Sequence, residues 1–125
     1  MIRFSKEKVL LLHQIMAEAT GGDAGVRDEA LLESAIETIY STFDGTELYP
    51  TKEEKAAMLG YSLISNHAFV DGNKRIGMYI MLSFLELNGI RIDASNEEVA
   101  KLGLNVADGS ADKDVILKWI KDHKK

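Results

Sequence analysis

A nine-residue stretch in the middle of the chain carries most of the residue types that could perform chemistry. It runs from His67 to Arg75 and reads HAFVDGNKR. Histidine has an ordinary pKa near neutrality, so His67 could take a proton from an attacking hydroxyl. A carboxylate such as that of Asp71 is a usual ligand of magnesium beside phosphate oxygens. The stretch therefore predicts a general base and a metal ligand on one short connection.

The four residues after the aspartate are typical of an anion site. A buried helix is expected to begin at Asn73, where free N–H groups and the positive end of the helix dipole favour a bound anion. Gly72 would let the backbone approach a ligand closely. Lys74 and Arg75 add positive charge at the helix end where the dipole disfavours cations. These residues predict a phosphate cradle and, with the base and the carboxylate, phosphoryl-type transfer.

Simpler roles exist for the same residues. His67, near a helix C-terminus, could interact with the last carbonyls and the dipole. Asp71 could be the N-cap of the following helix, which is the commoner role for an aspartate at such a position. Lys74 and Arg75 could form a solvated surface pair.

Three further ring side chains are not expected to react. Phe69 is expected to be a core anchor that fixes the loop. His13 lies beside a leucine run and His123 lies in a basic tail. The sequence suggests a partner for neither histidine, so both are weak candidates for the site.

Helices must position this stretch, because the chain has one proline in 125 residues and its glycines separate long periodic segments. We predict an all-α fold, a compact bundle of about six helices around a central buried helix, with a short flap hairpin. The expected helices are Lys6 to Thr20, about Asp28 to Tyr40, Thr51 to about Asn66, Asn73 to Asn88, Ser95 to about Asp108, and Asp112 to His123.

Local signals support these boundaries. Thr51 with Glu54, and Ser95 with Glu98, have the spacing of capping boxes. Gly89 suits the left-handed position after a helix end. In the fourth helix, the apolar residues surround the axis, which predicts burial on most sides. These residues are Ile76, Met78, Tyr79, Ile80, Met81, Leu82, Phe84, Leu85 and Leu87.

The segment Ser41 to Pro50 reads STFDGTELYP. Its Asp44-Gly45 pair is typical of a tight turn, and its threonines and aromatics suit extended chain. We therefore predict a short hairpin, which we call the flap.

Composition narrows the classes of function. The chain has no cysteine, which excludes a disulfide scaffold, and its net charge of -5 disfavours a nucleic-acid partner. The longest stretch without charged residues, 56–70, contains an asparagine, a histidine and two serines, so no segment is expected to span a membrane. A single domain over residues 1–125 without an export signal predicts a cytoplasmic protein.

The stretch HAFVDGNKR resembles the signature of the Fic and Doc superfamily, H-x-F-x-[D/E]-[G/A]-N-[K/G]-R. GVRDEALLESA (25–35), the helix before the motif and FLELNG (84–89) are similar to the death-on-curing branch, so the resemblance covers essentially the whole chain. It implies the all-α fold that the periodicity predicts independently. It also implies His67 as general base, Asp71 as ligand of Mg²⁺, Phe69 as buried anchor, and Gly72, Asn73, Lys74 and Arg75 as the cradle for ATP.

Two positions bear on the reaction that the resemblance implies. Adenylyl-transferring Fic enzymes have glycine at the eighth motif position and a second arginine further on, where this chain has Lys74 and Met78. A lysine would fill space that the glycine form leaves for a diphosphate, so another nucleotide pose is expected. The resemblance to the death-on-curing branch implies a reversed pose that presents the γ-phosphate to the target hydroxyl. Phosphorylation is the leading chemistry, with adenylyl transfer and a non-enzymatic anion-binding or partner-binding module as alternatives.

The resemblance also implies a biological setting. The branch consists of toxins of toxin-antitoxin pairs, and their implied target is a hydroxyl on a translation factor such as elongation factor Tu. The flap corresponds in position to the family segment that aligns a target peptide. No glutamate of the chain is followed by Gly or Asn, so the self-inhibitory motif [S/T]-x-x-x-E-[G/N] is absent. Restraint by an antitoxin protein in trans is therefore expected.

Overall fold

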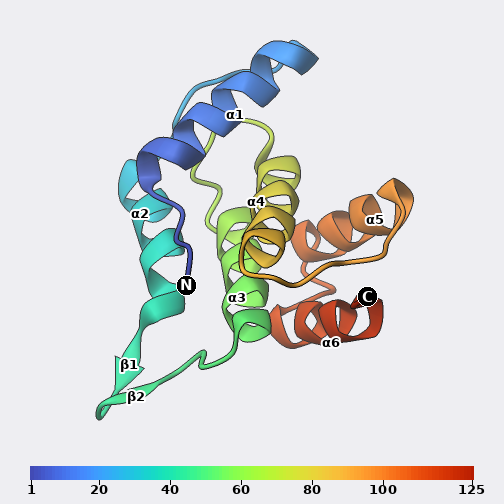
Figure 1. Ribbon diagram of the computed structural model, residues 1–125. Coiled ribbons are helices and arrows are strands. Elements are labelled where there is room, and N and C mark those ends of the chain that lie inside the picture. Colours follow the sequence, from blue (N-terminus) through green and yellow to red (C-terminus); the bar gives the residue numbers. More distant parts are fainter.

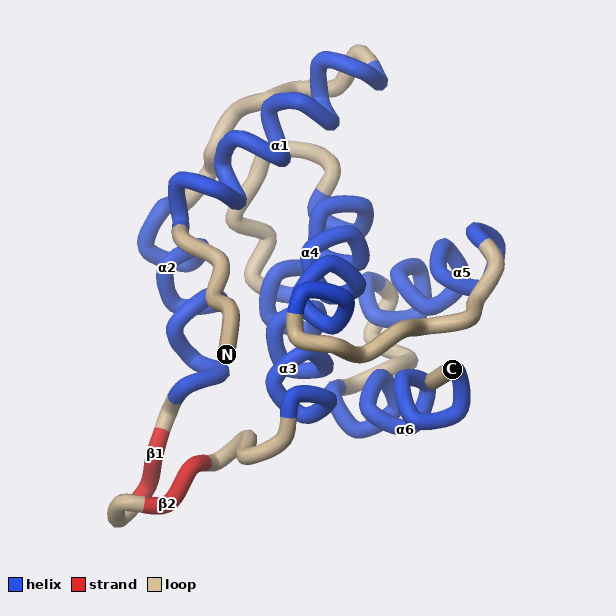
Figure 2. Tube along the Cα trace, in the orientation of Figure 1, coloured by secondary structure: helices blue, strands red, loops and turns tan.

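Six α-helices and one small hairpin make up the computed structural model, which describes residues 1–125 (Figures 1 and 2). The predicted all-α fold and flap are confirmed. The helices are α1 (Lys6–Thr20), α2 (Glu29–Glu37), α3 (Lys52–Ser65), α4 (Asn73–Leu87), α5 (Asn96–Ala107) and α6 (Lys113–His123). A 3-10 turn (Thr38–Tyr40) follows α2, and β1 (Thr42–Phe43) pairs antiparallel with β2 (Thr46–Glu47).

Helices α3 and α4 occupy the middle of the molecule, with α1 and α2 on one side and α5 and α6 on the other (Figure 1). Five apolar side chains of α4 are fully buried: Ile76, Ile80, Met81, Phe84 and Leu85. Tyr79 and Leu87, in contrast, are exposed, so the burial of α4 does not extend all the way around its axis. The prediction of a central buried helix is otherwise confirmed.

Glycine allows α3 and α4 to approach closely. A Cβ atom on Gly77 of α4 would lie 2.5 Å from Cγ1 of Ile64 and 3.4 Å from the carbonyl oxygen of Gly60, both on α3. Ile64 is fully buried and belongs to the main apolar core. Any side chain at position 77 would therefore push the two central helices apart.

The predicted caps are present, with one difference. Ser95 and Glu98 form a complete capping box. Thr51 accepts a hydrogen bond from the Glu54 N–H as expected. The Glu54 carboxylate, however, accepts from the Thr51 hydroxyl at 3.0 Å instead of reaching the cap backbone, so the second half of that box was predicted wrongly.

The flap projects from the body of the molecule (Figure 2). Its turn has positive φ at both Asp44 (52°) and Gly45 (78°), the combination that suits a two-residue hairpin. Lys55 of α3 is buried and fixes the base of the flap by donating to the Glu47 carboxylate at 2.9 Å and to the Tyr49 carbonyl. The tip of the flap has no such support and is exposed.

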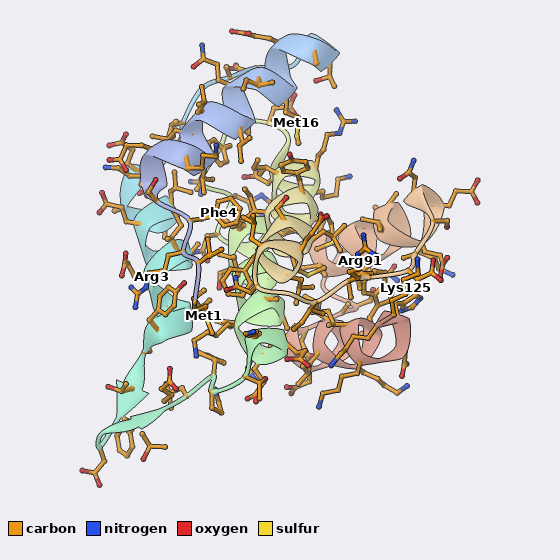
Figure 3. All side chains as sticks on the ribbon, in the orientation of Figure 1. Met1, Arg3, Phe4, Met16, Arg91 and Lys125 are labelled. Atoms are coloured by element: carbon orange, nitrogen blue, oxygen red, sulfur yellow. The ribbon has the colours of Figure 1, made fainter.

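Both chain ends are attached to the body. Phe4 is buried and points inward from the N-terminal segment (Figure 3). The Asn88 amide, at the end of α4, pairs with the backbone N–H and carbonyl of Ile2. At the other end, Lys125 donates its backbone N–H to the Arg91 carbonyl at 3.0 Å. None of the helices has both the length and the apolar character needed to cross a membrane.

Candidate functional site

Backbone contacts from a distant loop hold the connection between α3 and α4. The Ala68 carbonyl accepts from the N–H groups of Arg27 and Asp28, and the Val70 N–H donates to the Gly25 carbonyl at 3.0 Å. Phe69 is buried, which confirms it as the anchor of the loop. The loop before α2 therefore acts as a support for the motif.

The Asn73 side chain closes the motif loop from within. Its Oδ1 accepts from the Phe69 N–H at 3.1 Å, and its Nδ2 donates to the Phe69 carbonyl at 3.0 Å. The sequence placed Asn73 in the anion cradle. The structure shows that its amide holds the loop, whereas its backbone N–H stays available at the start of α4.

Gly72 is the N-cap of α4, with a left-handed φ of 80° and no side-chain cap. The alternative that Asp71 is the N-cap is therefore wrong, because the chain turns one residue later than that role requires. The Asp71 carboxylate instead accepts from the Gly72 N–H through Oδ1 at 2.9 Å. Asp71 is exposed, and its Oδ2 has no hydrogen-bond donor in the protein.

The first turn of α4 has unused donors. The N–H groups of Asn73, Lys74 and Arg75 have no acceptor, since the first bond of the turn runs from Ile76 to the Gly72 carbonyl. The Lys74 and Arg75 side chains are exposed and form no ion pair or hydrogen bond. Three free N–H groups and two free cations at the positive end of one helix suit a polyanion.

A cavity of about 890 Å³ opens at this end of α4. Its walls come from α1, the loop after α1, the start of α4 and one face of α5. Asp71, Gly72, Asn73, Lys74 and Arg75 line it together, as do Met16, Gly22 and Gly103. Met16 of α1 lies beside the first turns of α4 (Figure 3). The structure thus brings five of the six predicted site residues to one cavity.

His67, the sixth, is exposed and does not line the cavity. Its backbone has a positive φ of 49°, and its carbonyl accepts from Arg27 Nε at 2.6 Å. The imidazole makes no hydrogen bond in the protein, so the alternative of a ring bonded to the last carbonyls of α3 finds no support. His67 remains free to meet a second molecule, and its role as a base remains a prediction.

The sequence analysis treated His13 as a weak candidate without a partner, which was wrong, and it did not single out Gly22. His13 is buried, and its Nε2 lies 2.7 Å from the Asp71 carbonyl oxygen. Gly22 lies so close to the motif that a Cβ atom there would be 2.9 Å from Asp71 Oδ2. The pattern of helix 6–20 predicts that position 13 faces inward, but no local signal links either residue to a loop near position 70.

The donor set fits a metal that is shared with a phosphate. No group of three or more His, Cys, Asp or Glu side chains converges on one point. The protein therefore offers no complete set of ligands for a metal ion, and a phosphate would have to supply some of them. The one free carboxylate oxygen of Asp71 stands beside the anion-binding end of α4. Magnesium takes one or two carboxylates together with phosphate oxygens and water, and Asp71 fits that role.

Most of the chain matches a known protein family. A model described as the Fic/DOC family matches residues 3–85. The chain belongs to this family. It is also 43% identical over 76 residues to "Toxin Doc" of Mycolicibacterium smegmatis (strain ATCC 700084 / mc(2)155). That alignment covers 61% of this chain and 58% of the relative, so it spans little more than half of that protein. The resemblance to the Fic and Doc superfamily is confirmed.

Proposed function

We propose that this protein is the toxin of a toxin-antitoxin pair and transfers the γ-phosphoryl group of ATP to a hydroxyl group on a protein. One observation carries the proposal: three unpaired N–H groups, two unpaired cations and the free oxygen of Asp71 meet at one cavity. The family membership and the similarity to a protein named as a toxin support it.

The side chains divide the work of the transfer. Lys74, Arg75 and the N–H groups at the start of α4 would bind the phosphates and stabilise charge as it develops. Asp71 would hold magnesium, which supplies further positive charge to the phosphate oxygens when it is bound. His67 would accept the proton of the attacking hydroxyl from the solvent side of the loop, where the protein substrate arrives.

Lys74 supports phosphoryl rather than adenylyl transfer. It lines the cavity with no carboxylate partner, so its charge is available to the nucleotide. In the adenylyl-transferring relatives a glycine leaves this space for a diphosphate, as the sequence resemblance implies. A lysine here favours the nucleotide that presents its γ-phosphate to the target.

The proposed partners follow from the family rather than from a surface of the molecule. We propose a translation elongation factor such as elongation factor Tu as the substrate, and a small antitoxin protein as the inhibitor. Expression of the chain with the neighbouring reading frame of its operon should yield a complex that co-purifies. Recovery of the chain alone, folded and without toxicity, would contradict the antitoxin proposal.

The deciding experiment uses ATP labelled at either the α or the γ phosphate. The purified chain is incubated with Mg²⁺, elongation factor Tu and each labelled nucleotide in turn. Transfer of the γ label alone is expected. Transfer of the α label would show an adenylyltransferase, and transfer of neither, with the fold verified by circular dichroism, would favour a binding module or another substrate.

Replacing His67 with alanine tests the base in the same assay. Because the imidazole is exposed and makes no hydrogen bond, His67→Ala should leave the thermal unfolding midpoint unchanged. Loss of a general base typically slows transfer by about 10²-fold or more. A His67→Ala protein that transfers phosphate at the normal rate would remove His67 from the mechanism.

A further inference from the structure

His13 contacts the motif loop at three residues: Phe69, Asp71 and Gly72. Its ring stacks on Phe69 with centroids 3.7 Å apart and planes 12° apart. Its Nε2 lies 2.7 Å from the Asp71 carbonyl oxygen. A Cβ atom on Gly72 would lie 3.5 Å from the same nitrogen, so the ring also packs against that residue. One side chain of α1 thus packs against the loop that carries the site and hydrogen-bonds to its backbone.

The hydrogen bond to Asp71 shows which nitrogen of the His13 ring carries the proton. A carbonyl oxygen only accepts hydrogen bonds, so Nε2 must carry the proton. The other nitrogen, Nδ1, makes no hydrogen bond in the protein. The side chain is 2% exposed, and burial of an imidazole is costly unless its polar atoms are used. An apolar side chain would fill this position at lower cost if packing were its only task.

The contact helps to fix the orientation of the peptide group between Asp71 and Gly72. His13 holds its carbonyl, and the Asp71 carboxylate holds its N–H through Oδ1 at 2.9 Å. With both polar groups engaged, the peptide cannot rotate without breaking one of the two bonds. The engagement of Oδ1 leaves Oδ2 free, and the same peptide leads into the left-handed Gly72 at the start of α4.

We propose that His13 is a positioning residue that aims the Asp71 carboxylate by holding the peptide that follows it. The inference rests on the proposed function only in taking Asp71 as the ligand of a divalent ion. Groups that orient a metal ligand typically change metal affinity by 10-fold to 100-fold when they are removed. The donor of His13, rather than its bulk, should therefore determine how tightly a divalent ion binds.

The test measures Mn²⁺ binding by electron paramagnetic resonance in the presence of ATP, because Mn²⁺ accepts the same oxygen ligands as Mg²⁺. His13→Phe keeps a ring that can stack on Phe69 but lacks the donor. His13→Gln places an N–H donor at a similar distance from the backbone. We expect His13→Phe to weaken Mn²⁺ binding about tenfold and His13→Gln to restore most of the affinity.

A second histidine offers a matched control. His123 also stacks on an aromatic ring, that of Trp119 at 4.2 Å, and also bonds to a backbone carbonyl, but it lies on α6 and does not line the cavity. His123→Phe should bind Mn²⁺ as the wild type does. Equal affinity of His13→Phe and the wild type would overturn the inference, as would no rescue by His13→Gln.

Two further measurements separate this inference from the proposed function. Nitrogen-15 shifts of the wild type should show His13 protonated at Nε2, and protonation at Nδ1 alone would overturn the inference even if the variants fail to fold. In the label assay, His13→Phe should raise the Mg²⁺ concentration for half-maximal transfer about tenfold without changing the KM for the protein substrate. Weakened Mn²⁺ binding by His13→Phe would support the inference even if the wild type transfers no phosphate to elongation factor Tu, a result that counts against the proposed function alone.

Discussion

The side chains of the motif separate into those that build the loop and those that stay available. Phe69 and Asn73 build it, one by burial and the other by two hydrogen bonds to backbone atoms. Lys74, Arg75 and the second carboxylate oxygen of Asp71 remain without partners. A phosphate can bind with little reorganisation where the loop is already held rigid and the charged groups that would contact the phosphate have no other partner.

Gly22 leaves space for the Asp71 carboxylate. Its φ lies outside the left-handed region, so alanine fits the backbone, but the new Cβ would lie 2.9 Å from Asp71 Oδ2 and force the carboxylate to turn. We expect Gly22→Ala to lower phosphoryl transfer about tenfold or more with little change in the thermal midpoint. In an Asp71→Ala background the same substitution should have no further effect. Additive losses in the double variant would contradict a route through the carboxylate.

The sequence predicted which residues belong to the site more accurately than it predicted the hydrogen bonds that their side chains make. The order and spacing of HAFVDGNKR indicated the carboxylate, the glycine and the two cations that line the cavity. The sequence could not show that the Asn73 amide is occupied by Phe69, because buried backbone groups need partners that only the folded loop identifies. His13 was judged a weak candidate because its partner lies 58 positions away along the chain.

At the scale of elements, helix ends follow local chemistry while helix contacts do not. Ser5, Asp28, Ser95 and Asp112 each accept a hydrogen bond from the first turn that they precede, as their types predict. The end of α2 was less accurately predicted, because the chain tightens into a 3-10 turn at 38–40. Apolar periodicity predicts a buried face, but it does not say which neighbour covers that face.

Gly77 tests the contact between the two central helices. In an exposed helix a Gly to Ala change stabilises by about 1 kcal/mol. Here the added methyl would lie 2.5 Å from Cγ1 of Ile64, a fully buried side chain, so one of the two must shift. We expect Gly77→Ala to destabilise the fold by about 1 to 3 kcal/mol in urea unfolding. Gly103→Ala, which would meet the flexible Met78 side chain at 3.1 Å, should cost less.

His123 makes the link between α5 and α6 sensitive to pH. Its Nδ1 donates to the Trp119 carbonyl and its Nε2 donates to the Glu98 carboxylate, and both nitrogens donate only in the protonated ring. The Trp119 carbonyl, and next to it Glu98, raise the pKa of His123 above its ordinary value. Its contribution to stability is therefore complete below about pH 6.5 and is lost as pH rises through the folded pKa.

Urea unfolding between about pH 6 and pH 8.5 would measure this contribution. The free energy of unfolding of the wild type, minus that of His123→Gln, should be largest at the acid end and fall as pH rises. A difference that does not vary with pH would show that the neutral ring makes the same contacts.

At the scale of the whole molecule, the two halves of the fold have different tasks. Helices α1 and α2 lie on the opposite side of the central pair from α5 (Figure 1). The loop between α1 and α2 supports the motif through backbone hydrogen bonds, whereas residues of α5 line the cavity. The flap stands apart from both and is held at its base by Lys55. This division could not be read from the sequence, since it depends on which helices meet across the centre.

We expect the tip of the flap to contact the protein substrate. Phe43 is 76% exposed and lies on a strand edge that an extended peptide could join. Phe43→Ser should lower transfer to the protein substrate several-fold by raising its KM, while ATP binding and the thermal midpoint stay unchanged. Val115→Ser, which removes an exposed apolar residue of α6, is the matched control and should have no effect. A higher KM in both variants would argue against a role for the flap.

The pairing of Ile2 with Asn88 has a consequence for how the protein is made. Its two partners are separated by 86 positions, and the contact of His13 with Asp71 by 58. Helix α1 is translated before α4, so the groups that α1 must contact are still missing when it is made. A nascent chain that ends before α4 therefore has neither the supported loop nor the start of α4, and the anion site forms only after α4 has been synthesised.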